Sequence, residues 1–244
     1  MQDRYAGDIG DYGKIGLLRK IHSHGLSVGV NWYKTDPLES EKNKTGTFRQ
    51  DDGKHLIPDN LRICDRELAE RLSEIARPEN RSIESLENAN LIPNAVYYRD
   101  PITVSKRIEW HLRALEVLKN KDVVFLDPDN GMLVKSVGKR SAKSVKYVFY
   151  DEVTDYLEQK QSVIIYNHRC RKKEEQYFRD ICEKFEKYSG IQEKDILKIT
   201  FPKCSVRDYF AIPVNKDHRE RLSSAFGSMT QGIWGERGVC RIPD

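Results

Sequence analysis

The chain has 244 residues and a formal net charge of +4, with 33% charged and 38% hydrophobic residues. This length is enough for one sizeable domain with its own core, and the composition excludes a disordered or fibrous chain. No apolar run approaches membrane-spanning length and no segment resembles a signal peptide, so we expect no membrane partner. The five cysteines are scattered without a C-x-x-C pair, which argues against a zinc site or a disulfide framework and favours a cytoplasmic location.

Short apolar runs alternate with helical patterns along the chain. Strands are expected at 28–33, 95–98, 123–126, 162–166, 196–201 and 209–214, with an extended segment at 146–150. Helices are expected near the N-terminus and at 65–76, 103–119 and 173–188. Continuous apolar strands separated by helices predict a mostly parallel sheet that is covered on both faces. We therefore expect a Rossmann-like, methyltransferase-type α/β three-layer sandwich, one domain over 1–244, whose sheet ends in a C-terminal hairpin.

The apolar periodicity also predicts which helix faces are buried. Asp65 is the expected N-cap of the first of these three helices. The buried stripe of 103–119 is expected to comprise Ile108, Leu112, Leu115 and Leu118. The inward face of 173–188 is expected to comprise Tyr177, Phe178, Ile181, Cys182, Phe185 and Tyr188. The polar segment 34–62 is expected to be a long loop over one edge of the site, with Lys54 and His55 as acid–base candidates.

Polar residues follow the apolar strands at the positions where a ligand binds an open α/β sheet, beyond the carboxyl ends of the strands. The strand 123–126 runs directly into Asp127-Pro-Asp129-Asn130-Gly, in which proline fixes φ and glycine allows a tight turn. Asn31 lies in the first strand, and Asp100 follows the second. We therefore expect these side chains to converge on one edge of the sheet.

A second polar motif lies in the glycine-rich segment 5–18. It reads Tyr-Ala-Gly-Asp-x-x-Asp-x-x-Lys, and its charged members are Asp8, Asp11 and Lys14. This motif and the Asp127 loop resemble segments of the bacterial ribosomal-RNA adenine-N6 methyltransferases of the RlmJ type. That family begins with a tyrosine and Ala-Gly-Asn-x-x-Asp-x-x-Lys, and it later has an apolar strand that ends in Asp-Pro-Pro-Tyr. The segment 161–168 is similar to a third strand of the family, so three short segments match in chain order.

The resemblance implies an S-adenosylmethionine-dependent methyltransferase that acts on nucleic acid. For this interpretation, the expected catalytic residues are Asp127, Asp129, Asn130, Lys14 and Asp11, and the expected cofactor-binding residues are Asp8, Asn31 and Asp100. The chain departs from the family where the second proline is Asp129 and the aromatic residue is Asn130, which cannot stack on a flipped base. The glycine-rich turn that normally follows the first strand and receives the methionine end of the cofactor is also missing.

One cluster of basic residues follows the Asp127 loop, and a second follows the expected strand at 162–166. Such clusters suit the phosphate backbone of DNA or RNA. The residues expected to contact nucleic acid are Lys139, Arg140, Lys143, Arg169, Arg171 and Lys172.

The sequence leaves two further functions open. The first is a metal-dependent phosphodiesterase or nuclease, in which Asp127, Asp129, Asp151 and Glu152 would bind Mg²⁺ or Mn²⁺. The second is a non-catalytic nucleic-acid-binding module built on a degenerate enzyme fold, which would also use the basic clusters. The methyltransferase interpretation itself requires no metal.

Overall fold

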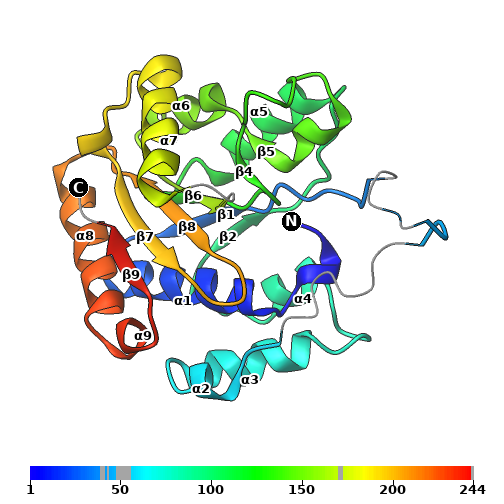
Figure 1. The fold of residues 1–244 in the computed structure, drawn as a ribbon, viewed down its shortest axis with the longest axis vertical. Coiled ribbons are helices and arrows are strands. Elements are labelled where there is room, and N and C mark those ends of the chain that lie inside the picture. The colour runs from blue at the N-terminus through cyan, green and yellow to red at the C-terminus, as the bar shows by residue number, and fades with distance from the viewer. Residues whose placement is uncertain (39–41, 43, 48–55, 170–172, 243–244) are drawn as a thin grey trace.

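The computed structural model describes residues 1–38, 42, 44–47, 56–169 and 173–242. Its central sheet has seven strands in the order β2-β1-β3-β6-β8-β7-β9 (Figure 1). The strands are β1 (Val28–Asn31), β2 (Val96–Tyr98), β3 (Val123–Leu126), β6 (Ser162–His168), β7 (Leu197–Phe201), β8 (Arg207–Ile212) and β9 (Cys240–Ile242). All run in the same direction except β8 and β9. The sheet is therefore mostly parallel and Rossmann-like, as predicted.

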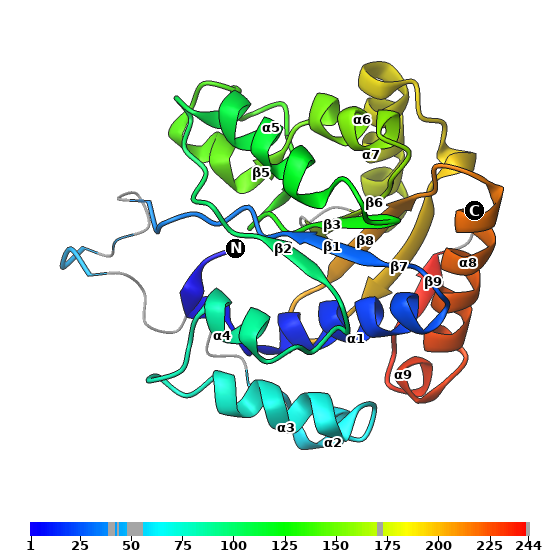
Figure 2. The ribbon, with the colours of Figure 1, turned by 180° about the vertical axis from the view of Figure 1, so that it is seen from behind.

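Helices cover both faces of this sheet and complete a three-layer sandwich (Figures 1 and 2). One layer contains α5 (Arg107–Leu118), α6 (Tyr150–Glu158) and α7 (Glu174–Ser189). The other contains α1 (Ile9–Ser23), α4 (Ile83–Asn88), α8 (Lys216–Thr230) and α9 (Ile233–Glu236), and α2 (Asp59–Arg62) and α3 (Arg66–Ile75) pack on the side of α1 that faces away from the sheet. Two short strands, β4 (Gly131–Met132) and β5 (Tyr147–Val148), pair beside the first layer. Each layer has its own apolar cluster against the sheet.

The C-terminal part of the sheet differs from the prediction. The expected hairpin is present because β7 and β8 are antiparallel neighbours, but β8 lies between β6 and β7, and β9 forms the edge. The sequence reasoning missed both β9 and the helix α8. The expected loop 34–62 is described only in part, because residues 39–41, 43 and 48–55 lie outside the described residues. The candidates Lys54 and His55 belong to this undescribed part. The end of the expected loop forms α2.

Two predicted helix faces need correction. Ile108 and Leu112 of α5 are 80% and 61% exposed, whereas Trp110 and His111 are buried. The rotation of α5 follows from Arg107, whose guanidinium is held inside the protein by Glu152 at 2.6 Å. In this orientation the buried carboxylate of Glu152 keeps a cationic partner, and a buried charge without a partner is costly. In α7, Tyr188 is 54% exposed rather than inward-facing.

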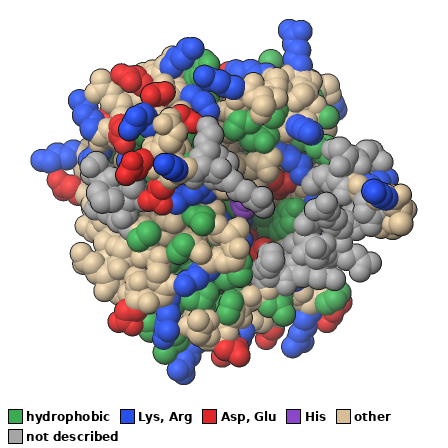
Figure 3. Space-filling view, viewed as in Figure 1, with side chains coloured by type: hydrophobic (Ala, Val, Ile, Leu, Met, Phe, Trp, Pro, Cys, Tyr) green, Lys and Arg blue, Asp and Glu red, His purple; other side chains and the backbone are tan. Residues whose placement is uncertain are grey.

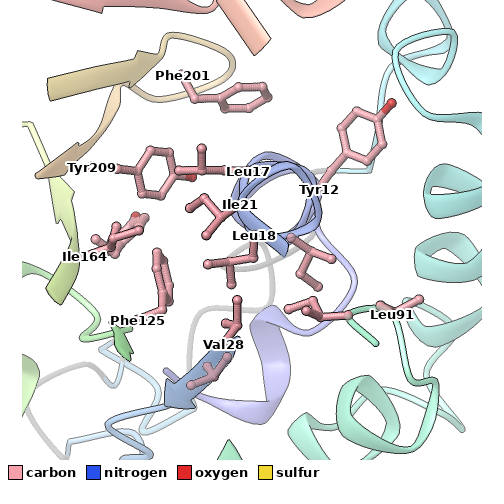
Figure 4. Packing of buried hydrophobic residues seen from close by; sticks show 14 of the residues in the cluster. Tyr12, Leu17, Leu18, Ile21, Val28, Leu91, Phe125, Ile164, Phe201 and Tyr209 are labelled. Atoms are coloured by element: carbon pink, nitrogen blue, oxygen red, sulfur yellow. The ribbon is translucent and has the colours of Figure 1, made fainter. Parts of the chain in front are cut away.

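Helix α1 lies beneath the sheet and is buried along most of its length. Its side chains Leu17, Leu18 and Ile21 pack among residues of the sheet (Figure 4). Gly13 lets the helix approach β7, because a Cβ at this position would lie 2.9 Å from the ring of Phe201. Glycines in this segment therefore serve close packing, and they allow a helix with a charged N-terminal half to enter the core.

The variant Gly13→Ala tests this packing constraint. The added methyl group would force the buried Phe201 ring to move, and we expect the free energy of unfolding to fall by about 1–2 kcal/mol despite the better helix propensity of alanine. Urea denaturation measures the change. Gly227→Ala in α8 is the matched control, because nothing lies within 4 Å of its added Cβ. The free energy of unfolding of the control should rise by about 0.5–1 kcal/mol. A Gly13→Ala protein as stable as this control would contradict the proposed packing.

Candidate functional site

A polar cavity of about 340 Å³ opens at the carboxyl ends of β3 and β6, beside the N-terminus of α1. The face shown in Figure 3 is hollowed between the two layers of helices. The cavity brings together six residues that the sequence selected: Asp8, Asp11, Lys14, Asp127, Asp129 and Asn130. Further polar and aromatic side chains come from Tyr5, Lys146, Tyr166, His168 and Arg207. The size lies within the range of small-ligand sites.

Lys14 joins the N-terminal motif to the loop that follows β3. Its Nζ atom lies 2.7 Å from Oδ2 of Asp127 and 2.9 Å from Oδ1 of Asp11. All three side chains are nearly inaccessible, with 5% exposure for Lys14, 2% for Asp127 and 1% for Asp11. Lys14 and Asp11 lie one turn apart on α1, so the same helix face presents both of them to the strand end.

Lys14 lies between two carboxylates in this cluster, and burial has the largest effect on the pKa values of both carboxyl groups. Desolvation raises the pKa of Asp127 above its usual value, although the charge of Lys14 opposes the rise and that of Asp11 adds to it. Desolvation also raises the pKa of Asp11, again against the effect of Lys14. Burial alone would lower the pKa of Lys14, but the two carboxylates raise it, so the lysine stays charged. Asp127 is therefore suited to accept and release a proton nearer to neutral pH than an ordinary aspartate.

Asp129 is held in its ionised form at the other side of the loop. It lies 2.9 Å from the amino nitrogen of Met1 and 3.1 Å from Nζ of Lys146, and Gln2 donates a hydrogen bond to it at 2.7 Å. Burial would raise the pKa of Asp129, but the two cations lower it to about 2. The neighbouring Asn130 is partly buried, and its backbone joins β6 to the segment before β5. Asp127 and Asp129 thus differ in their readiness to take up a proton.

The loop is fixed after Asn130 by a glycine. Gly131 has a φ of +112°, and a Cβ there would lie only 1.9 Å from Oδ1 of Asn167. The same oxygen accepts a hydrogen bond from the backbone nitrogen of Met132 at 2.8 Å. Only glycine fits a positive φ together with so close an approach. The Asp127 loop is consequently held in one shape between β3 and β6.

Asp8 and Arg207 lie at the N-terminus of α1. Asp8 caps the helix by accepting hydrogen bonds from the backbone nitrogens of Gly10 and Asp11 at 2.7 and 3.0 Å. Burial raises the pKa of Asp8, against the lowering effect of the nearby Arg207. Partial desolvation and the charge of Arg207 together lower the pKa of His168. A carboxylate and a guanidinium are therefore presented side by side at the cavity.

Two predicted cofactor-binding residues do not line the cavity. Asn31 is fully buried, where its Nδ2 donates to the hydroxyl of Tyr156 at 3.1 Å and its Oδ1 accepts from the backbone nitrogen of Tyr33 at 3.2 Å. The carboxylate of Asp100 is 55% exposed and lies 4.0 Å from Arg113. Asn31 therefore supports the end of β1 within the core, and Asp100 lies at the surface.

The four carboxylates of the expected metal site do not come together. Glu152 accepts hydrogen bonds from Arg107 at 2.6 Å and from the Tyr33 hydroxyl at 3.0 Å in the other layer. Asp151 is exposed and paired with Lys139 at 2.8 Å. Within 1–38, 42, 44–47, 56–169 and 173–242, no group of three or more His, Cys, Asp or Glu residues is placed to hold a metal ion.

The basic residues expected at a nucleic-acid interface fall into different environments. Lys139, Arg140 and Lys143 are exposed. The guanidinium of Arg169 is instead held by Asp208 at 2.5 Å and by Glu174, so it stabilises the end of β6. The predicted contacts Arg171 and Lys172 lie outside the described residues.

Two residues of the cavity, Lys146 and Tyr166, were given no role in the site from the sequence. Lys146 reaches the cavity because β5 pairs with β4 directly after the Asp127 loop. Tyr166 reaches it from near the end of β6, with its ring centroid 5.6 Å from Nζ of Lys14. The strand-end rule that selected Asp127 could have selected Tyr166 as well.

No protein-family model, curated protein or solved structure matches the chain. Among the described residues, no helix has the length and apolar character needed to cross a membrane.

The variant Lys14→Met tests the central cluster. Removing the cation leaves Asp11 and Asp127 buried together, and we expect the free energy of unfolding at neutral pH to fall by about 3–5 kcal/mol. A carboxyl group with a raised pKa in the folded state stabilises the fold below its unfolded pKa, and this contribution is lost as the pH rises through the folded value. The deficit should therefore shrink as the pH is lowered.

Urea denaturation at several pH values measures both effects. Lys119→Met is the control, because Lys119 is paired with Glu116 on the surface at the end of α5 and its loss should cost at most about 1 kcal/mol. Equal losses in the two variants, or a Lys14→Met deficit that grows at low pH, would contradict the assigned charges.

Proposed function

We propose that the chain is an S-adenosylmethionine-dependent methyltransferase that modifies an amino group of a nucleic-acid base. The observation that carries this proposal is the convergence of two distant motifs in one cavity. Asp8, Asp11 and Lys14 come from the start of the chain, while Asp127 and Asn130 come from the end of β3. These are the two motifs on which the resemblance to adenine-N6 methyltransferases rests.

The arrangement of the sheet supports the same proposal. Parallel strands with an antiparallel pair near the C-terminus were expected of a methyltransferase-type sandwich, and β7 and β8 form such a pair. The cavity also lies at the carboxyl ends of β3 and β6, where open α/β sheets bind their ligands. Fold alone does not define a reaction, which is set by the side chains in the cavity.

The chemistry of the cavity fits both reactants. The Asp8 carboxylate and the Arg207 guanidinium would hold the ammonium and carboxylate groups of the cofactor's methionine moiety. Asn31 and Asp100 cannot take this role, because neither lines the cavity. Tyr5 and Tyr166 line it and would supply the aromatic faces for a flipped base that Asn130 cannot provide.

Asp127 would accept a hydrogen bond from the target amino group, and the side-chain oxygen of Asn130 would accept another. The cofactor supplies the methyl group. Asp127 would take up the proton that the nitrogen loses, a role that its raised pKa favours. Lys14 would hold the Asp127 carboxylate in place, and the ionised Asp129 would stay anchored to Lys146. The phosphodiesterase interpretation lacks such support, since its four carboxylates lie in three different environments.

The variant Asp127→Asn tests the proposal. The wild-type protein should bind S-adenosylmethionine in a calorimetric titration and transfer a tritiated methyl group to mixed-sequence single-stranded DNA or RNA. We expect Asp127→Asn to lower the transfer rate by about a hundredfold to ten-thousandfold, the usual contribution of a general base. Asp217→Asn is the control, because Asp217 pairs with Arg221 on the surface of α8.

Absence of cofactor binding by the wild-type protein would overturn the methyltransferase proposal. Transfer that survives in Asp127→Asn at the level of Asp217→Asn would show that Asp127 is not the general base of the reaction.

The variant Asp11→Asn tests how the cluster sets the pKa of Asp127. Activity should rise with pH as Asp127 loses its proton, and the negative charge of Asp11 helps to keep that pKa raised. Without this charge, Asp127 no longer shares the Lys14 cation with a second carboxylate. We therefore expect the acidic limb of the kcat/KM profile to move to lower pH in Asp11→Asn. An unchanged limb, or one at higher pH, would contradict this coupling.

A further inference from the structure

A groove leads away from the site along α7. It consists of two adjoining cavities of about 640 and 290 Å³ that share Val134, Lys135, Tyr150, Lys184 and Tyr188. The larger one also shares Asn130 and His168 with the site cavity. The site is therefore continuous with a groove whose walls are residues 131–139 and helix α7.

Aromatic rings line this groove. Tyr147 and Tyr177 line the larger cavity, and Tyr150 and Tyr188 line both cavities. The ring of Tyr188 is 54% exposed and lies 5.3 Å from that of Tyr150. A large aromatic side chain with so much exposed surface, next to a second ring, forms a platform on which a planar group can stack.

Tyr150 lies beneath this platform. It is only 6% exposed, and its hydroxyl oxygen is buried. Because that oxygen is inaccessible, Tyr150 contributes its ring, and not its hydroxyl, to the wall of both cavities.

The lining of the groove has a formal net charge of +1, from four lysines and three acidic residues. Its lysines are Lys135, Lys139, Lys184 and Lys187, and its acidic residues are Asp151, Asp180 and Glu183. Asp151 is paired with Lys139 at 2.8 Å. Nζ of Lys187 lies 5.3 Å from the ring of Tyr188, which sets a cation beside the exposed stacking surface. Rings interleaved with lysines are the combination that binds unpaired bases together with their phosphates.

We propose that this groove binds single-stranded nucleic acid and leads a target nucleotide past Asn130 and His168 into the site. A duplex keeps its bases stacked on one another, so it cannot offer them to Tyr188 and Tyr150. The delivery of a nucleotide rests on the proposed function, whereas binding in the groove can be tested by itself. The groove thus narrows the substrate class to unpaired DNA or RNA.

Fluorescence anisotropy with labelled oligonucleotides of about 12 nucleotides tests the groove, since proteins of this kind cover about 4–16 nucleotides. Single-stranded DNA or RNA should bind the wild-type protein more tightly than the duplex of the same sequence. Tyr188→Ala should weaken single-strand binding by about fivefold to a hundredfold, as the removal of one stacked ring predicts. The double variant Lys135→Ala, Lys187→Ala should make binding less dependent on salt. The slope of the logarithm of the binding constant against the logarithm of the salt concentration should become shallower by about 0.7 for each phosphate that a lysine no longer neutralises.

Lys216→Ala is the control, because Lys216 is exposed on α8 in the opposite layer of the sandwich. It should leave both the affinity and the salt slope unchanged. Equal binding by Tyr188→Ala and Lys216→Ala, or tighter binding of the duplex than of the single strand, would overturn the inference.

Calorimetric titration of Tyr188→Ala with S-adenosylmethionine separates the two proposals. Unchanged cofactor affinity together with weakened oligonucleotide binding in this variant supports both. Cofactor binding by the wild-type protein without any oligonucleotide binding overturns the groove and leaves the methyltransferase. Oligonucleotide binding that depends on Tyr188, with no cofactor binding by the wild-type protein, supports the groove and overturns the methyltransferase.

Discussion

The ion cluster of Lys14 with Asp11 and Asp127 is the constraint on which the site depends. It places three charges out of contact with water, and such burial is tolerated only when each charge keeps a close partner. The N-terminal helix must therefore lie under the sheet with its charged face at the end of β3. Gly13 allows this placement of the helix, because the absence of a Cβ lets α1 pack closely against Phe201.

The cluster also gives neighbouring carboxylates different properties. Asp127 and Asp11 share one cation and have raised pKa values, whereas Asp129 has close cationic partners and its pKa falls to about 2. Two groups that differ in this way can divide the work of a site, one exchanging a proton and the other keeping the loop in place. Gly131 adds rigidity, because its positive φ and the close contact with Asn167 exclude other loop shapes.

The strands and the core of the site could be predicted from the sequence, for physical reasons. Buried parallel strands are continuous apolar runs, and their carboxyl ends meet at one edge, so Asp127 and its neighbours had to lie there. The rule fails for strand-end side chains that point into the core or lie at the surface. Asn31 points into the core, where Tyr156 and Tyr33 satisfy it, and Asp100 lies at the surface. Periodicity likewise could not reveal the rotation of α5, which Arg107 and Glu152 fix through a long-range ion pair.

Basic residues near the site differ in whether a carboxylate already neutralises them. Arg169 looks like a phosphate contact in the sequence, but Asp208 neutralises it and it holds β6 to β8. Tyr188, which periodicity places in the core, is instead exposed beside Tyr150. Only the folded chain shows which charges are already paired and which rings remain open to a ligand. An interface is therefore better inferred from exposed rings beside lysines that border the site than from the density of basic residues along the sequence.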